Sequence, residues 1–203
     1  MNAAWGWRLL RREGKHGYAG HELRDAAFQV VSVATTTGYA TTDYLLWPTI
    51  GPVLMLLLGA IVSCAGSTGG GIKMVRVLIL AKVTLHELVQ LIHPRVVNPV
   101  TLGGQTVPAR VIGAVIAYML VYGAVLVGLS LLMLASGLDV VTAVSAIIAC
   151  LNNIGPGMGK VGPAGNYAVL TDFQIWLCSL AMMLGRLELL SVLVLFTPQF
   201  WRR

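Results

Sequence analysis

The sequence is short of charged side chains and of cysteine, and both shortages narrow the class of protein. Only 11% of its 203 residues are charged, whereas 57% are hydrophobic. This balance excludes a disordered chain and is extreme for a soluble domain. Cys64, Cys150 and Cys178 all lie in apolar stretches without C-x-x-C spacing. Such cysteines favour packing roles over a disulfide framework or a metal site.

The sequence also lacks the signatures of an enzyme and of a secretory signal. No Ser/His/Asp or Cys/His arrangement is present, and the four histidines lack the spacing of metal ligands. Gly66–Lys73 differs from a phosphate-binding loop, because Ile72 precedes the lysine and Met74 replaces the hydroxyl residue. The basic N-terminus precedes no apolar run, so it is no signal peptide. We expect no enzyme and no nucleic-acid partner.

Long apolar runs take the place of these missing features. Val111–Ala135 carries no charge and exceeds the roughly 20 residues that cross a bilayer. Two further spans are expected, each interrupted by a polar segment: Phe173–Phe200 by Arg186 and Glu188, and Pro48–Cys64 with Ile72–Ile92 by a glycine loop. The sequence therefore predicts a multi-pass protein whose first partner is the lipid bilayer.

Two polar, glycine-rich segments interrupt this apolar sequence, at Ser32–Thr42 and Gly66–Lys73. Non-helical backbone at membrane depth is tolerated only where it is buried in protein or lines a water-filled path. Thr35–Gly38 offers a row of carbonyls and hydroxyls that can replace the water around a small cation. These segments indicate an ion pathway with a gate beneath it. For the three consecutive glycines, a static kink is the alternative to a gate.

An internal repeat organises the chain. Ala26–Ala34 leads into Thr35–Gly38, and Val140–Cys150 leads into Asn152–Gly157. Each apolar stretch is too short to cross a bilayer, which predicts a re-entrant helix, and each precedes a long apolar helix with a break. Internal repeats are common in membrane transport proteins. Only the second copy has a preceding span, so we expect the chain to be a fragment, or a split product, of a longer protein.

Charge placement predicts the orientation and gives Arg186 a role. With both re-entrant segments outside, the net positive charge falls on the cytoplasmic side, as the positive-inside rule expects. A lone arginine near the centre of a span costs at least a few kcal/mol in lipid. Arg186 therefore faces either the pathway, which we favour, or a salt-bridge partner on a neighbouring helix.

Several strings together resemble the TrkH/TrkG potassium-uptake subunits of bacteria, over most of the chain from Leu23 to Trp201. They are Phe28–Gly38, Cys64–Lys73, His93-Pro94-Arg95, Ala149–Gly157 and Leu184–Glu188. The resemblance implies an all-α membrane protein built from M1–pore-helix–M2 units of the potassium-channel-like type, with about one and a half to two of four units here. Residues 1–92 would be the third unit without its first helix, 93–110 a cytoplasmic linker, and 111–203 the fourth unit.

The resemblance also implies a set of site residues, with potassium as the transported ion. The filter would consist of Thr36, Thr37, Gly38, Asn153, Ile154 and Gly155. The gate loop would consist of Gly66, Ser67, Thr68, Gly69, Gly70 and Gly71, with Arg186 as the pore arginine.

Potassium transport across the bacterial inner membrane is the function that the resemblance implies. A complete pore would need the missing N-terminal half or a second copy, as a homodimer. A cytosolic nucleotide-binding regulatory subunit is expected at the basic Lys82–Arg110 segment. Two alternatives stay open: a non-conducting membrane assembly or interaction fragment, and a secondary transporter with a broken-helix substrate site.

Overall fold

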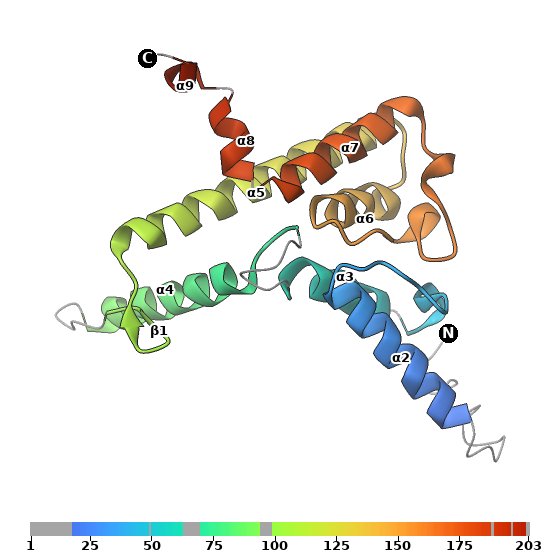
Figure 1. Ribbon diagram of the computed structural model, residues 1–203, viewed down its shortest axis with the longest axis horizontal. Coiled ribbons are helices and arrows are strands. Elements are labelled where there is room, and N and C mark those ends of the chain that lie inside the picture. Colours follow the sequence, from blue (N-terminus) through green and yellow to red (C-terminus); the bar gives the residue numbers. More distant parts are fainter. Residues whose placement is uncertain are drawn as a thin grey trace.

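The computed structural model describes residues 18–48, 50–62, 70–93, 99–187, 189–195 and 197–201, and this part of the chain is mainly helical (Figure 1). The expected all-α class is confirmed. The α-helices are α2 (Tyr18–Ala34), α3 (Ile50–Ile61), α4 (Met74–Ile92), α5 (Ala109–Ala135), α6 (Val140–Leu151), α7 (Asp172–Arg186), α8 (Leu189–Leu195) and α9 (Pro198–Trp201). Short 3-10 helices are η1 (Tyr44–Leu46), η2 (Gly159–Val161) and η3 (Tyr167–Val169), and strands β1 (Thr101–Leu102) and β2 (Gln105–Thr106) pair antiparallel.

Helix α5 is apolar on all sides but is buried along one stripe only. Tyr118, Tyr122, Leu129 and Met133 are buried, and their spacings of four, seven and four residues place them on one face. On another face, Leu120 is 70% exposed. Among the described residues, α5 alone is long and apolar enough to cross a membrane. It matches the predicted span Val111–Ala135.

Helix α6 is the buried centre of the second half of the chain. It packs against both α5 and α7 (Figure 1). Small side chains allow this close approach, and Ala143, Ala146 and Ile147 are completely buried. Asp139 begins the helix by accepting a hydrogen bond from the Thr142 amide at 3.0 Å, which satisfies one of the free donors of the first turn. The predicted short helix over Val140–Cys150 is therefore confirmed.

The first short helix is longer than its apolar stretch predicts. Helix α2 starts at Tyr18, well before the predicted beginning at Ala26. The additional turns are polar and exposed, with Glu22 and Arg24 on their surface. Apolar pattern alone cannot detect such turns, because their side chains bury nothing against the rest of the chain.

Both long apolar segments that follow the polar loops are divided, as the sequence predicts. Helix α3 ends at Ile61 and α4 begins at Met74. Helix α7 ends at Arg186, and α8 begins at Leu189. Between α4 and α5 the chain forms a β-hairpin, which was not predicted. Its turn residues, Gly103 and Gly104, both have positive φ, as the common two-residue hairpin turn requires.

Candidate functional site

The two polar-glycine segments share an unusual backbone conformation. Thr36 has a φ of 54° and Gly38 a φ of 78°; in the second segment Asn153 has a φ of 55° and Gly155 a φ of 104°. Among the described residues, Thr36 and Asn153 are the only non-glycine residues with positive φ. Left-handed conformations are rare for such side chains, especially for a β-branched threonine. The same sequence of conformations therefore occurs directly after α2 and directly after α6.

Matching hydrogen bonds hold these two segments to their helices. The Thr37 amide donates to the Ser32 carbonyl at 2.8 Å, and the Ile154 amide donates to the Ala149 carbonyl at 2.9 Å. Both bonds reach back five residues and so close the end of the helix.

The two segments lie against each other. A Cβ atom built on Gly155 would be 3.6 Å from the Gly38 Cα, and one built on Gly38 would overlap the Ile154 carbonyl oxygen. The Ile154 side chain is 3% exposed and packs over Gly59 of α3, where an added Cβ would be 2.5 Å from its Cδ1. The second polar-glycine segment is therefore packed against α3, in the first half of the chain.

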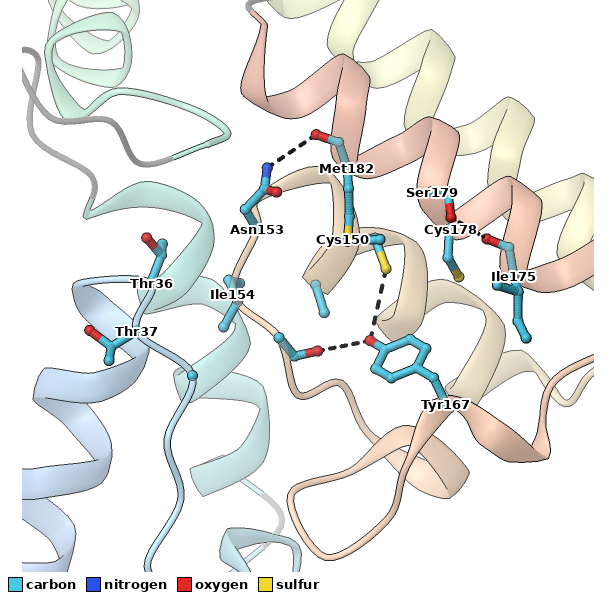
Figure 2. Close-up of a pocket in the computed structure, with 13 residues that line it drawn as sticks. Thr36, Thr37, Cys150, Asn153, Ile154, Tyr167, Ile175, Cys178, Ser179 and Met182 are labelled. Carbon is cyan, nitrogen blue, oxygen red and sulfur yellow. Dashed lines mark hydrogen bonds between the residues drawn. The ribbon is translucent and has the colours of Figure 1, made fainter.

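A cavity of about 350 Å³ opens between these segments and α7 (Figure 2). All six predicted filter residues line it, together with side chains from α6, η3 and α7. The full lining is Thr36, Thr37, Gly38, Ala149, Cys150, Asn153, Ile154, Gly155, Tyr167, Ile175, Cys178, Ser179 and Met182. Cys150 and Cys178 are buried free thiols, as the sequence predicts, and Cys64 lies outside the described residues.

Two tyrosines that sequence reasoning missed also belong to this site. Tyr167 donates a hydrogen bond to the Gly155 carbonyl at 2.8 Å, and Tyr44 donates to the Gly157 carbonyl at 3.4 Å. Each begins a 3-10 helix whose preceding residue, Asp43 or Asn166, accepts from the backbone two residues on. The sequence feature that could have indicated these two tyrosines is an Asp-Tyr or Asn-Tyr pair shortly before an apolar helix.

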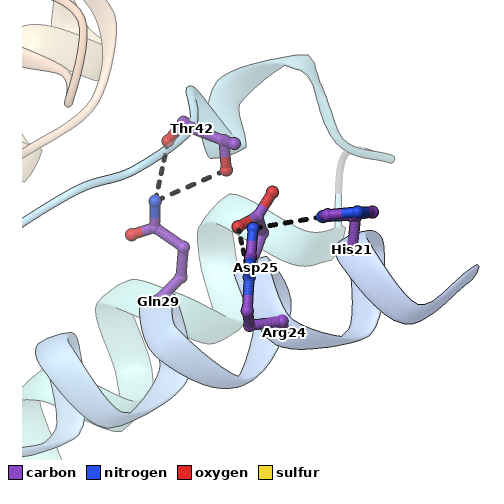
Figure 3. A network of polar contacts seen from close by, with 5 residues as sticks. All are labelled: His21, Arg24, Asp25, Gln29 and Thr42. Atoms are coloured by element: carbon purple, nitrogen blue, oxygen red, sulfur yellow. Dashed lines mark hydrogen bonds and ion pairs between the residues drawn. The ribbon is translucent and has the colours of Figure 1, made fainter. Parts of the chain in front are cut away.

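Two polar side chains of α2 form hydrogen bonds to the chain that follows the first polar-glycine segment. Gln29 is completely buried, and its Nε2 donates to the Thr42 carbonyl at 2.8 Å (Figure 3). The Ser32 hydroxyl donates to the Tyr39 carbonyl at 2.6 Å. These two bonds hold the chain just after the first polar-glycine segment, at Tyr39 and Thr42, to α2, the helix that precedes the segment.

The described end of the glycine loop lies directly against Asn152 and Asn153 at the start of the second polar-glycine segment. A Cβ on Gly70 would be 2.5 Å from Asn153 Nδ2, and one on Gly71 would overlap the Asn152 side-chain amide. Gly71 has a φ of 79°, so glycine is required there for two reasons. The rest of the predicted gate loop, Gly66, Ser67, Thr68 and Gly69, lies outside the described residues.

Arg186 is the last residue of α7, and its side chain is exposed. The preceding residue, Gly185, packs so closely on the Leu151 carbonyl that a Cβ there would overlap it. Asn152, which follows Leu151, contacts Gly71. The backbone of α7 thus reaches the end of α6 beside the glycine segment, one residue before Arg186.

Comparison with known proteins agrees with this geometry. The model of a family described as "TrkH: Cation transport protein" matches residues 16–203. The chain belongs to the TrkH family. The Trk system potassium uptake protein TrkH of Vibrio parahaemolyticus is 44% identical over 177 residues, which is 87% of this chain and 36% of that protein. TrkG of Escherichia coli is 41% identical over 175 residues, or 86% of this chain and 36% of that protein.

A solved TrkH structure has the same fold. The crystal structure of the potassium transporter TrkH from Vibrio parahaemolyticus superposes on this chain with a TM-score of 0.84 at 41% sequence identity. The superposed region covers 96% of this chain and 41% of the TrkH chain. The sequence therefore spans little more than a third of the length of these TrkH relatives. This chain therefore has the fold of the corresponding part of a TrkH protein.

Proposed function

We propose that this chain supplies two adjacent pore units of a potassium transporter in the bacterial inner membrane. The observation that carries the proposal is the pair of matched loops, with left-handed Thr36 and Asn153 followed by positive-φ Gly38 and Gly155. The relatives are named potassium uptake proteins. Residues 1–92 would then belong to the third unit and 111–203 to the fourth, joined by the segment 93–110.

In this proposal potassium sheds its water against backbone carbonyls. Carbonyl oxygens replace the hydration shell of an ion in a filter. Here the coordinating oxygens would be the backbone carbonyls of Thr36, Thr37, Asn153 and Ile154. Helices α2 and α6 both end immediately before these segments. The C-terminus of a helix carries partial negative charge, so both helix ends favour a cation at the filter.

Beneath the filter, the glycine segment and Arg186 would control passage. Gly70 and Gly71 contact Asn152 and Asn153, and this contact supports a role in the path of an ion that leaves Asn153–Gly155, the second filter segment of this proposal. The missing N-terminal half, or a second copy in a homodimer, would complete the ring. A cytosolic nucleotide-binding regulatory subunit would bind on the side of the 93–110 linker.

Rubidium and sodium flux in proteoliposomes tests the filter, with Gly38→Ser as the variant. A side chain at Gly38 would overlap the Ile154 carbonyl and displace that oxygen from the ion, so discrimination of rubidium over sodium should fall about two- to tenfold, the range for loss of one net polar contact. Gly113→Ala on α5 is the matched control, because nothing lies within 4 Å of the Cβ it would add. Discrimination unchanged from the control would contradict the filter role and favour an organic-substrate transporter. An absence of flux from the unmodified protein would favour a non-conducting assembly fragment.

A further inference from the structure

Two tyrosines of α5 lie buried between the second filter segment and the glycine segment. Tyr118 is 2% exposed and Tyr122 is 6% exposed. They are one helical turn apart, and their rings stack with centroids 6.3 Å apart and planes at 25°.

Each tyrosine hydroxyl donates to a different part of the pathway. Tyr118 donates to the Gly71 carbonyl at 3.2 Å, and Tyr122 donates to Asn152 Oδ1 at 3.1 Å. Asn152 is completely buried, and its Nδ2 donates to the Ile148 carbonyl of α6 at 2.7 Å. The Asn152 side chain is therefore held from both sides, by α5 and by α6, immediately before Asn153.

The surroundings make these hydrogen bonds costly to break. Both tyrosines belong to an apolar cluster with Leu151, Leu184 and Leu189. A polar group that loses its partner in such a cluster has no water to replace it. On the side of α4, the Arg76 guanidinium carbon lies 3.8 Å from the centre of the Tyr118 ring, a cation–π contact that ties the start of α4 to the same pair.

We propose that Tyr118 and Tyr122 are positioning residues that fix the glycine segment and the second filter segment relative to each other. Tyr122 sets the filter through Asn152, so its loss changes ion selectivity. Tyr118 holds the end of the glycine segment through Gly71, so its loss changes the rate of passage. This role rests on the proposed transport function, because it requires an ion path past both segments.

The test compares Tyr118→Phe and Tyr122→Phe in the assembled transporter, reconstituted in proteoliposomes and normalised to inserted protein. Each change removes one hydroxyl and keeps the ring. Ser130→Ala is the matched control: Ser130 is also buried on α5, and its hydroxyl has no hydrogen-bond partner in the described part of the chain. The readouts are rubidium flux and the ratio of rubidium to sodium flux.

The two variants should differ in which readout they change. Since one net hydrogen bond corresponds to a factor of about two to ten, Tyr122→Phe should lower the rubidium-to-sodium ratio by that factor. Tyr118→Phe should raise rubidium flux by a similar factor and leave the ratio at the control value. A role in folding alone would lower the inserted protein without this split between rate and selectivity.

A double variant tests whether Tyr122 acts through Asn152. Asn152→Ala removes the acceptor of the Tyr122 hydroxyl, so adding it to Tyr122→Phe should lower the ratio no further than the larger single change. Additive losses, or both tyrosine variants equal to the control in flux and ratio, would overturn the positioning role. Failure of the unmodified transporter to pass rubidium would instead overturn the proposed function, on which this role depends.

Discussion

At the scale of single residues, the left-handed conformations of Thr36 and Asn153 need an explanation. Such a conformation in a non-glycine residue costs on the order of 1–3 kcal/mol and persists where the surroundings impose it. Here the bonds from the Thr37 and Ile154 amides back to α2 and α6 impose it. Strain of this kind, repeated at two matched positions, is typical of a ligand site rather than of a connecting loop.

Asp139 gives a stability prediction with a defined pH dependence. Hydrogen bonds from the Thr142 amide and hydroxyl hold the pKa of Asp139 below its ordinary value. The ionised cap therefore stabilises the protein at neutral pH, and its contribution is lost as the pH falls through that lowered pKa. Asp139→Ala should cost about 1 kcal/mol at neutral pH.

Thermal unfolding of the detergent-solubilised protein at about pH 7 and about pH 3 checks this sign. The difference between the unmodified protein and Asp139→Ala should be larger at the higher pH. A difference that grows as the pH falls would contradict the capping role.

Arg186 gives a prediction about flux. A unit charge about 10 Å from a passing cation contributes about 1.7 kcal/mol at an effective dielectric constant near 20. Arg186→Ala should therefore raise rubidium flux by up to about twentyfold, and Arg186→Lys should change it less because the charge is retained. Equal effects of the two substitutions, with equal amounts of inserted protein, would show that the charge does not act on the ion.

Sequence reasoning found some site residues and missed others for a physical reason. Gly38 and Gly155 stand out because glycine follows a short polar run inside apolar sequence. Tyr118 and Tyr122 do not, because they sit in a helix whose pattern is apolar throughout. Their partners, Gly71 and Asn152, lie far away in the sequence, and only the packing of α4, α5 and α6 brings them together.

At the scale of elements, the break between α3 and α4 lets the glycine segment approach the end of α6. Three consecutive glycines can adopt several backbone conformations, and the described pair Gly70–Gly71 fits against Asn152 and Asn153 only because neither glycine has a Cβ. The sequence predicted the break, but the contact with Asn152 and Asn153 could not be predicted, since it depends on how α4 approaches α6.

Deletion of Gly69–Gly71 tests the gate interpretation. Removal of an obstruction should raise rubidium flux in liposomes, normalised to inserted protein. The matched control is Gly113→Ala, which leaves the glycine segment intact. Flux at background with folded, inserted protein would mean that the segment is structural or binds the ion, and the gate interpretation would be wrong.

The sequence predicted where helices occur better than it predicted where they begin and end. Helices α5 and α6 match their predicted ranges because each coincides with an apolar run that contains no charged residue. Helix α2 extends beyond its prediction, and the hairpin of β1 and β2 was missed. In both cases the residues concerned are mostly exposed, so no apolar periodicity marks them.

At the scale of the whole molecule, the exposed surface is as informative as the core. Leu120 and Trp176 are both more than two-thirds exposed, as suits side chains that face lipid or a further subunit. The cavity beside the proposed filter residues lies between the two polar-glycine segments and α7 (Figure 2). The chain covers little more than a third of the length of these relatives, and in the proposed pore the remaining units would complete the ring around this cavity.

Ion density in the assembled transporter tests the central claim most directly. Crystals soaked in thallium, a potassium substitute with strong anomalous scattering, would locate bound cations without a transport assay. We predict an anomalous peak between the two filter segments, coordinated by the carbonyls of Thr36, Thr37, Asn153 and Ile154. Anomalous density elsewhere in the protein, with none between these segments, would contradict the assignment of these residues as the potassium filter.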